Sequence, residues 1–193
     1  MANVDRVNGF MPVGNLITGS YNGKVREYWI KSDYATNLFV GDAVELVSGS
    51  SHATSGLPEI QQSAAGNVNT VGVIVGFKVN RTNAKTEHPG YSAASTEDFA
   101  YVVDDPFTIF EVQDNATGGV AIVNTLCNHV VAAGSTTTGA SGMELASSTT
   151  GTADGQWRVI GPSRRTDNDP TLANAKWLVM IAESERLAAS TGL

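Results

Sequence analysis

The sequence predicts an all-β protein, a small β-barrel or β-sandwich with long polar loops and an N-terminal arm. Short runs rich in β-branched and aromatic residues recur along the chain, as is typical of strands. Glycine, asparagine, aspartate and serine fill the stretches between them and favour turns. Helix signals are limited to a capped turn at residues 95–98 and a short C-terminal helix at residues 182–190. Many strands with little helix indicate a barrel or a sandwich.

The expected strands are assigned from their residue patterns. Residues 24–30 are rich in β-formers, although neither face of that strand is cleanly apolar. Residues 43–47 alternate more clearly between apolar and polar side chains. Residues 71–79 form a long apolar run, whose internal glycines mark a bend, a bulge or a close backbone approach. The remaining expected strands are residues 99–103, 107–112, 120–123, 129–133, 157–161 and 176–181.

The chain is expected to have two parts. Residues 1–23 form an N-terminal arm or an edge segment, and residues 24–193 form a β-rich domain with a candidate subdivision near residues 114–134. Two long polar excursions, at residues 80–98 and 134–156, separate strands. Such excursions are usually either functional or mobile.

Composition narrows the classes of function. The chain has 193 residues, a formal net charge of −7 and a sequence pI of about 4.8. An acidic protein without a basic cluster is a poor partner for nucleic acid, because that binding depends on lysine and arginine neutralising phosphates. No apolar run approaches the roughly 20 residues that span a bilayer, and the N-terminus lacks the features of a signal peptide. We therefore expect neither a nucleic-acid nor a membrane partner.

The stretch Gly134 to Gly142, GSTTTGASG, is close to a phosphate-binding loop. Its first eight residues fit G-x-x-x-x-G-K-[ST], except that Ala140 stands at the lysine position. An expected strand leads into it, but a Ser/Thr/Gly-rich stretch follows where a helix should begin. The missing lysine would contact the phosphates and the missing helix would direct its N-terminus at them. The pattern therefore predicts a strand-to-strand loop that binds no nucleotide.

Other reactive side chains also fall short of a catalytic or metal site. The three histidines are scattered along the chain without metal-ligand spacing. Asp104 and Asp105 are expected to point apart at a strand end and to cap a turn. Residues 167–169 begin like a calcium loop but lack the following glycine and the terminal glutamate. The sequence thus predicts no catalytic residues, no metal and no cofactor.

Cysteine and tryptophan are expected in the interior. Cys127 is the only cysteine, so no disulfide can form within the chain. It is expected on the same strand face as His129, whereas a Cys–His pair that acts on a substrate usually comes from separate elements. A small core cysteine is therefore the interpretation. Trp29, Trp157 and Trp177 lie within strand patterns, which favours core or interface aromatics over sugar-stacking ones.

Five segments of the chain follow one another in a recognisable order. They are VGDAV (40–44), VGVIVGF (71–77), YVVDDPFTIFEVQ (101–113), AAGSTTTGASGMEL (132–145) and NAKWLVMI (174–181). Together they resemble capsid cement, or head decoration, proteins of tailed phages. The resemblance extends over most of the chain and is strongest from residue 36 to residue 181. It implies a small β-barrel or β-tulip-like fold and supplies no catalytic residues.

The same resemblance implies a structural role in a bacteriophage. Such a protein binds outside the major capsid shell and stabilises the expanded shell by bridging major capsid subunits. Its implied partners are the major capsid protein and further copies of itself, most often as a homotrimer. Its implied location is the outer surface of the virion head, after synthesis in the host cytoplasm. The acidic charge and the absence of disulfides fit that role.

Candidate contact residues lie in two places. An apolar segment before the first clear strand is expected either to lie across a neighbouring subunit as an arm or to form an edge strand of its own domain. Its members are Phe10, Met11, Pro12, Val13, Leu16 and Ile17. The second place is the pair Arg164 and Arg165, which are candidate partners for carboxylates on the capsid.

Two other classes of function stay open at this point. One is a virion adhesin or fibre-type protein, in which the loop at residues 80–98 binds a host-surface glycan. The other is a small hydrolase that uses Cys127 or the pair Asp104 and Asp105. Copy number on the virion separates the first alternative from a cement protein, because an adhesin is present in only a few copies at the tail or a vertex.

Overall fold

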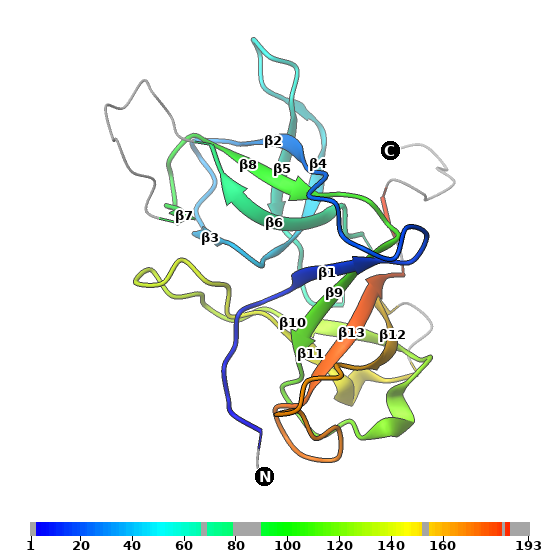
Figure 1. The fold of residues 1–193 in the computed structure, drawn as a ribbon. Helices are drawn as coiled ribbons and strands as arrows, with labels where there is room; N and C mark the ends of the chain where they lie inside the picture. Colours follow the sequence, from blue (N-terminus) through cyan, green and yellow to red (C-terminus); the bar gives the residue numbers. More distant parts are fainter. Residues whose placement is uncertain (1–2, 67–68, 79–89, 152–154, 183, 186–193) are drawn as a thin grey trace.

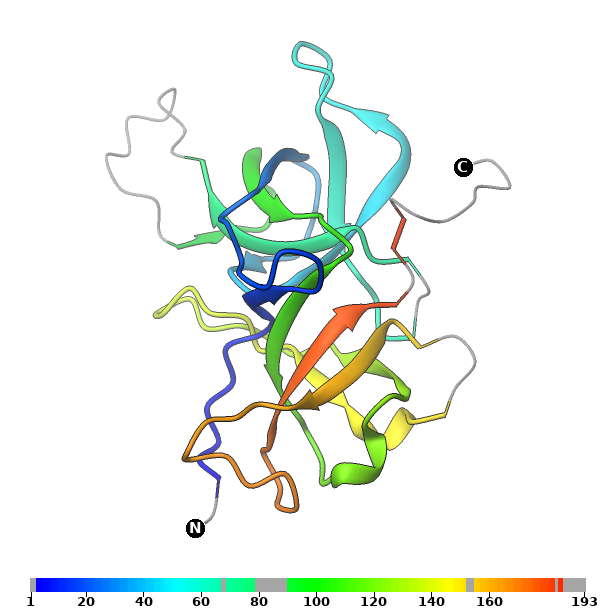
Figure 2. The ribbon, with the colours of Figure 1, turned by 45° about the vertical axis from the view of Figure 1, so that its right-hand side comes forward.

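The computed structural model confirms the all-β fold class and arranges most of the strands in two groups (Figure 1). It describes residues 3–66, 69–78, 90–151, 155–182 and 184–185. One group is a closed five-stranded barrel and the other is a six-stranded sheet. The barrel lies above the sheet in both views (Figure 1 and Figure 2), so the two groups of strands are stacked one on the other.

The barrel is built mainly from strands that the sequence predicts. Its members are β2 (Arg26–Ile30), β4 (Ala43–Ser51), β5 (Pro58–Gln62), β6 (Gly72–Phe77) and β8 (Asp98–Val103). The order is β2-β5-β4-β6-β8, and antiparallel pairing of β8 with β2 closes the barrel. The sequence pattern misses β5, because its sequence PEIQQ has one apolar side chain and begins with proline.

The six-stranded sheet is antiparallel throughout and has the order β1-β9-β13-β12-β10-β11. Its members are β1 (Met11–Asn15), β9 (Thr108–Gln113), β10 (Leu126–Val130), β11 (Glu144–Ala146), β12 (Trp157–Pro162) and β13 (Lys176–Ile181). A separate two-stranded pair joins β3 (Leu38–Phe39) to β7 (Tyr91–Ser92). Two 3₁₀ turns, η2 (Val120–Ile122) and η3 (Ser147–Thr149), complete the described elements.

Two of the expected strands are corrected by the structure. The strand expected at 120–123 is absent, because residues 120–122 form the 3₁₀ turn η2, which ends at Val123. Gly119 precedes the turn at φ 63°, a backbone conformation that breaks an extended chain, and Ile122 is the one residue of η2 that is buried. The strand expected at 129–133 lies at 126–130, because Cys127 and His129 are the alternating side chains that face the interior.

The N-terminal segment joins the sheet of its own chain. Strand β1 pairs with β9 and forms one edge of the six-stranded sheet, which corresponds to the edge-segment alternative for residues 1–23. The change from barrel to sheet occurs between β8 and β9, at residues 104–107, whereas the sequence placed a candidate subdivision near 114–134. The helix expected at 182–190 and the loop at 80–98 fall largely outside the described residues.

Two hydrophobic clusters stabilise the fold. One fills the barrel and includes Tyr28, Ile60 and Val102. The other covers the sheet and extends into the barrel through Ala43, Val73 and Val103. All three tryptophans are at most 9% exposed, which confirms their expected place in the interior.

The centre of the second cluster is a stack of aromatic rings. Phe10, immediately before β1, lies 4.0 Å from Trp157 between ring centroids with an interplanar angle of 13°. Phe110 meets the edge of the same tryptophan at 5.8 Å. Both phenylalanines and the tryptophan are fully buried. Phe10 therefore fixes the N-terminal strand to the sheet by burial and ring stacking.

The two groups of strands are joined by close backbone contacts. The Phe10 N–H donates to the Gly41 carbonyl at 2.9 Å. A Cβ atom added to Gly9 would come within 2.4 Å of that carbonyl oxygen, and Gly9 has φ +67°, so both space and conformation require glycine there. Backbone bonds from Val40 to Gly139 and from Ser141 to Val40 tie the loop after β10 to the same point.

We predict that Phe10→Ala lowers the free energy of unfolding by about 3–5 kcal/mol, because it removes a buried aromatic ring and leaves a cavity against Trp157. Urea denaturation followed by tryptophan fluorescence measures the change. Leu16→Ala is the matched control, since Leu16 is 56% exposed and its truncation should change stability by no more than about 0.5 kcal/mol. Equal effects of the two substitutions would contradict this account of the N-terminal segment.

Candidate interaction surface

The edge formed by β1 presents apolar side chains to solvent. Met11 is 42% exposed and Val13 is 49% exposed. Leu16 and Ile17, in the turn after β1, are 56% and 71% exposed. Pro12 is half-buried. We call Met11, Val13, Leu16 and Ile17 the apolar strip; Phe10 is excluded because it belongs to the core.

Hydrogen bonds hold the turn that carries the end of the strip. The Asn15 side-chain oxygen accepts the N–H of Ile17 at 2.9 Å and that of Thr18 at 3.1 Å. The Gly19 N–H donates to the Asn15 carbonyl at 2.8 Å and closes the turn. Such an Asx turn orders the backbone without using the apolar side chains, so Leu16 and Ile17 are left projecting from a fixed support.

The β1 edge is poorly suited to pairing with another strand. Pro12 supplies no N–H, and the register with β9 shifts between Pro12 and Gly14, which makes Val13 an extra residue of the strand. Proline and bulges are devices by which exposed sheet edges avoid adding strands. The strip is therefore suited to contact through side chains rather than through backbone pairing.

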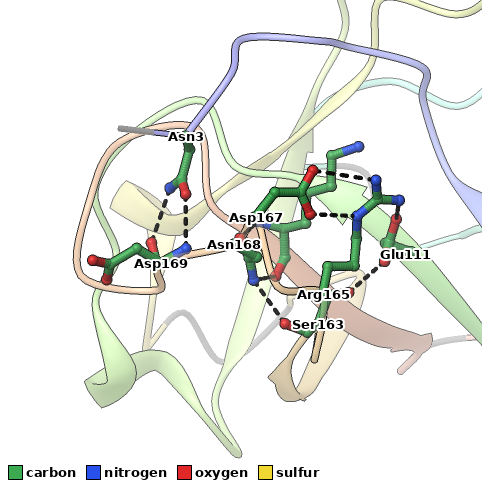
Figure 3. A network of polar contacts seen from close by, with 8 residues as sticks. Asn3, Glu111, Ser163, Arg165, Asp167, Asn168 and Asp169 are labelled. Carbon is green, nitrogen blue, oxygen red and sulfur yellow. Dashed lines mark hydrogen bonds and ion pairs between the residues drawn. The ribbon is translucent and has the colours of Figure 1, made fainter. Parts of the chain in front are cut away.

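The two arginines predicted as carboxylate partners differ in their contacts within the chain. Arg165 contacts two carboxylates of its own chain, Asp167 at 3.0 Å and Glu111 at 3.5 Å (Figure 3). Arg164 is exposed and has no ion-pair partner within the part of the chain that the structure describes. The sequence could not separate them, because adjacent residues of one type differ only in the direction of their side chains.

Residues 167–169, which resemble the start of a calcium loop, are tied to neighbouring segments. The Asn168 side-chain oxygen accepts the Lys176 N–H at 2.8 Å, and its amide donates to the carbonyls of Ser163 and Lys176, both at 2.9 Å. Asn3 exchanges two hydrogen bonds with the backbone of Asp169, at 2.7 and 2.9 Å (Figure 3). These polar groups therefore stabilise the loop between β12 and β13 and anchor the N-terminal residues to it.

A groove lies between the N-terminal residues and this loop. It consists of two adjacent cavities of about 80 and 250 Å³. Arg6, Arg165 and Lys176 line both cavities, and Met11 lines the larger one. The fold thus brings Met11 and Arg165, two of the sequence-predicted contact residues, to one place. Arg6 and Lys176 were not expected, because nothing in the linear sequence relates residue 6 to residue 176.

The loop at residues 134–142 connects β10 to β11, as the sequence predicted. It folds back on itself through the Ser135 N–H, which donates to the Ala140 carbonyl at 2.9 Å. Ala140 forms an isolated parallel bridge with Val40, which lies between β3 and the barrel strand β4. A Cβ atom on Gly134 would come within 2.4 Å of the Phe39 ring, so glycine at this position permits close packing between the loop and β3.

The carboxylate pair at the end of β8 diverges, as expected. Asp104 accepts the Tyr28 hydroxyl at 2.8 Å. Asp105 accepts the Phe107 N–H at 3.0 Å, which caps the turn before β9, and the Asn15 amide at 3.0 Å. The two carboxylates face different partners, so they do not form a shared acid–base site.

Cys127 and His129 are fully buried neighbours on one face of β10. Burial raises the pKa of the Cys127 thiol, partly opposed by the side chains of Thr150 and Thr125. The Trp157 indole N–H donates to His129 Nδ1 at 3.1 Å, so the ring proton lies on Nε2 and donates to the Ser63 carbonyl at 3.0 Å. The thiol is thus a core group, and the imidazole connects the sheet to the barrel.

Two buried titratable groups lie near the contact between barrel and sheet. Burial lowers the pKa of His129, which its bond to Ser63 only partly opposes. Burial raises the pKa of Asp42 to about 6, although the Ser141 side chain, the Phe39 N–H and the Gln62 amide favour its charged form. At a given pH, each group is therefore more often neutral in the folded protein than in the unfolded chain.

These two shifts act on stability in opposite directions. The folded pKa of His129 lies below its unfolded value of roughly 6.5, so its contribution is present above that pH and is lost as the pH falls. The folded pKa of Asp42 lies above its unfolded value, so its contribution is present below about pH 4 and is lost as the pH rises through about 6. Between about pH 4 and pH 6.5, a rise in pH increases the contribution of His129 to stability and decreases that of Asp42, so the two changes partly cancel.

Among the described residues, no three His, Cys, Asp or Glu side chains gather closely enough to hold a metal ion. Within the same residues, no helix is long and apolar enough to cross a membrane. Comparisons of the chain with protein-family models, with curated proteins and with solved structures return no match. A function for this chain must therefore rest on its own residues and their geometry.

We predict that Asp42→Asn makes the protein more stable than wild type at neutral pH by up to about 3 kcal/mol, and that this difference vanishes near pH 4. Asparagine keeps an oxygen for the Phe39 N–H but carries no charge to bury. Urea denaturation at several pH values gives the difference directly. Asp33→Asn, at an exposed aspartate, is the control, and a difference for Asp42→Asn that stays constant across this range would refute the assignment.

Proposed function

We propose that this chain is a structural virion protein that binds the outside of a tailed-phage head and stabilises the expanded shell by bridging major capsid subunits. The observation that carries the proposal is the apolar strip on the β1 edge, which is exposed, held by its own backbone bonds and unsuited to strand pairing. The resemblance of the five sequence segments to cement proteins supplies the class of partner.

The strip has the properties of a contact surface for another protein. Four apolar side chains that are 42% to 71% exposed lie along the β1 edge and the turn that follows it. Burying each of them would contribute about 1–2 kcal/mol, of which part is lost to the entropy of association. A single interface of this size is modest, so a bridging protein would gain most from several linked contacts.

We further propose that the protein acts as a homotrimer. A shell offers threefold and quasi-threefold points at which three capsid subunits meet, and a trimer can contact all three at once. Linked contacts of this kind raise the effective affinity by roughly 10²–10⁴ over one contact when the geometry allows it. The role needs no catalytic group and no cofactor, and an acidic protein of net charge −7 has little tendency to bind the DNA of the head.

We predict that Leu16→Ser/Ile17→Ser lowers the affinity of the protein for expanded heads by at least about tenfold, because two exposed apolar anchors are lost. Heads prepared without the protein are mixed with each variant, and the bound fraction is measured after sedimentation. Deletion of residues 1–17 is unsuitable here, since it would also remove Phe10 from the core.

Val120→Ser/Val131→Ser is the matched control, because these valines are also exposed, at 60% and 38%, but lie outside the strip. Both double variants should keep the wild-type unfolding midpoint. Equal binding by the two variants would refute the strip as the contact surface. Failure of the wild-type protein to bind heads would refute the proposed function itself.

A further inference from the structure

The groove beside the apolar strip has an unusual charge for this protein. The chain carries 12 lysines and arginines against 19 acidic residues, yet three of those cations line one small groove. Two acidic residues, Asp167 and Glu111, also line it. The local excess is therefore positive on a chain whose net charge is −7.

The three cations differ in whether their charge is already matched. Arg165 is paired with Asp167 and Glu111 of its own chain. Neither Arg6 nor Lys176 has an ion-pair partner among residues 3–66, 69–78, 90–151, 155–182 and 184–185. Arg165 has the largest effect in lowering the pKa of the Asp167 carboxyl, and Lys176 lies near enough to help lower it. Arg6 and Lys176 are therefore the two cations of the groove that no carboxylate holds in an ion pair among the described residues.

The backbones of both residues are held in place. The Arg6 N–H donates to the Gln113 side-chain oxygen at 2.8 Å. The Lys176 N–H donates to Asn168 at 2.8 Å, and Lys176 lies in β13 at the centre of the sheet. Both residues therefore line the groove from fixed backbones, which lowers the entropy lost when an anion is bound.

The groove is continuous with the apolar strip through Met11, which belongs to both. A ligand that filled both would need a negatively charged group beside apolar side chains, as in an extended acidic segment of a protein. A free phosphate has the charge but not the apolar part, and the carboxylates of Asp167 and Glu111 would repel its multiple charge. Charge and continuity therefore favour a protein carboxylate.

We infer that the groove lined by Arg6, Lys176 and Met11 binds a carboxylate-bearing segment of the partner protein, with the neighbouring strip receiving apolar side chains of the same partner. The inference rests on the proposed function, in which that partner is the major capsid protein. It assigns the carboxylate contact, expected from the sequence at Arg164 and Arg165, chiefly to Arg6 and Lys176.

The first test is head binding by Arg6→Gln/Lys176→Gln. Its affinity should fall by at least about tenfold at low salt and approach that of wild type at high salt, since exposed charges are screened. Arg164→Gln, a nearby exposed arginine that lines neither cavity, should change binding by less than about twofold. If wild type binds heads and the double variant binds them equally well, the groove inference fails while the proposed function stands; if wild type does not bind, the proposed function fails.

The second test identifies the partner group. A water-soluble carbodiimide joins a lysine amine to a carboxylate in direct contact, and mass spectrometry should find Lys176 linked to an aspartate or glutamate of the capsid protein. Lys176→Arg should keep binding and lose the link. Attachment at the exposed Lys24 with none at Lys176 would overturn the inference. So would inorganic phosphate that displaces the protein from heads more than sodium chloride does at the same ionic strength.

Discussion

The burial of Trp157 is the constraint on which the rest of the structure depends. Its ring stacks on Phe10, which fixes the N-terminal strand at the edge of the sheet. Its indole N–H donates to Nδ1 of His129, which places the imidazole proton on Nε2. That N–H donates to the carbonyl of Ser63, which follows the barrel strand β5. One side chain therefore connects three regions far apart in the sequence: the edge strand, the centre of the sheet and the barrel. Loss of the Trp157 ring would leave the buried Nδ1 of His129 without its hydrogen-bond donor, a cost added to that of the lost apolar contact.

This arrangement explains how a chain with few charged residues can present a defined surface. Phe10 is buried while Met11 and Val13 remain exposed on the adjoining strand, so the core anchors the residues of the proposed contact surface. The loop between β12 and β13 is held to the N-terminal residues by Asn3, which keeps Arg6 beside that loop. Contact residues on rigid supports lose less entropy on binding than residues on a free arm. In the proposed function, an edge strand with exposed side chains makes the contact, which corresponds to the edge-strand alternative for this segment and not to the arm.

The sequence predicts the fold class well and the residues of the proposed contact surface only in part. Alternating or long apolar runs with turn residues between them mark most strands, since burial of one face dictates the pattern. The strand PEIQQ at residues 58–62 does not show this pattern, because Ile60 is its single apolar residue after the proline. Hydrogen bonding within the closed barrel stabilises it. The exposed residues between Phe10 and Ile17 belong to a segment that the sequence marks as a candidate contact, because it is apolar and precedes the first clear strand. The proximity of Arg6 and Lys176 is not predicted, because only the folded chain brings the N-terminal residues and the start of β13 to the same cavities.

A cryo-electron microscopy reconstruction of expanded heads with the protein bound tests the central claim most directly. The account predicts many copies over the outer surface of the head, grouped as trimers where three capsid subunits meet. In that map the β1 edge, with Leu16 and Ile17, should face the capsid subunits and be buried against them. Copies confined to the tail or to a single vertex, or a β1 edge that faces solvent in every bound copy, would contradict it.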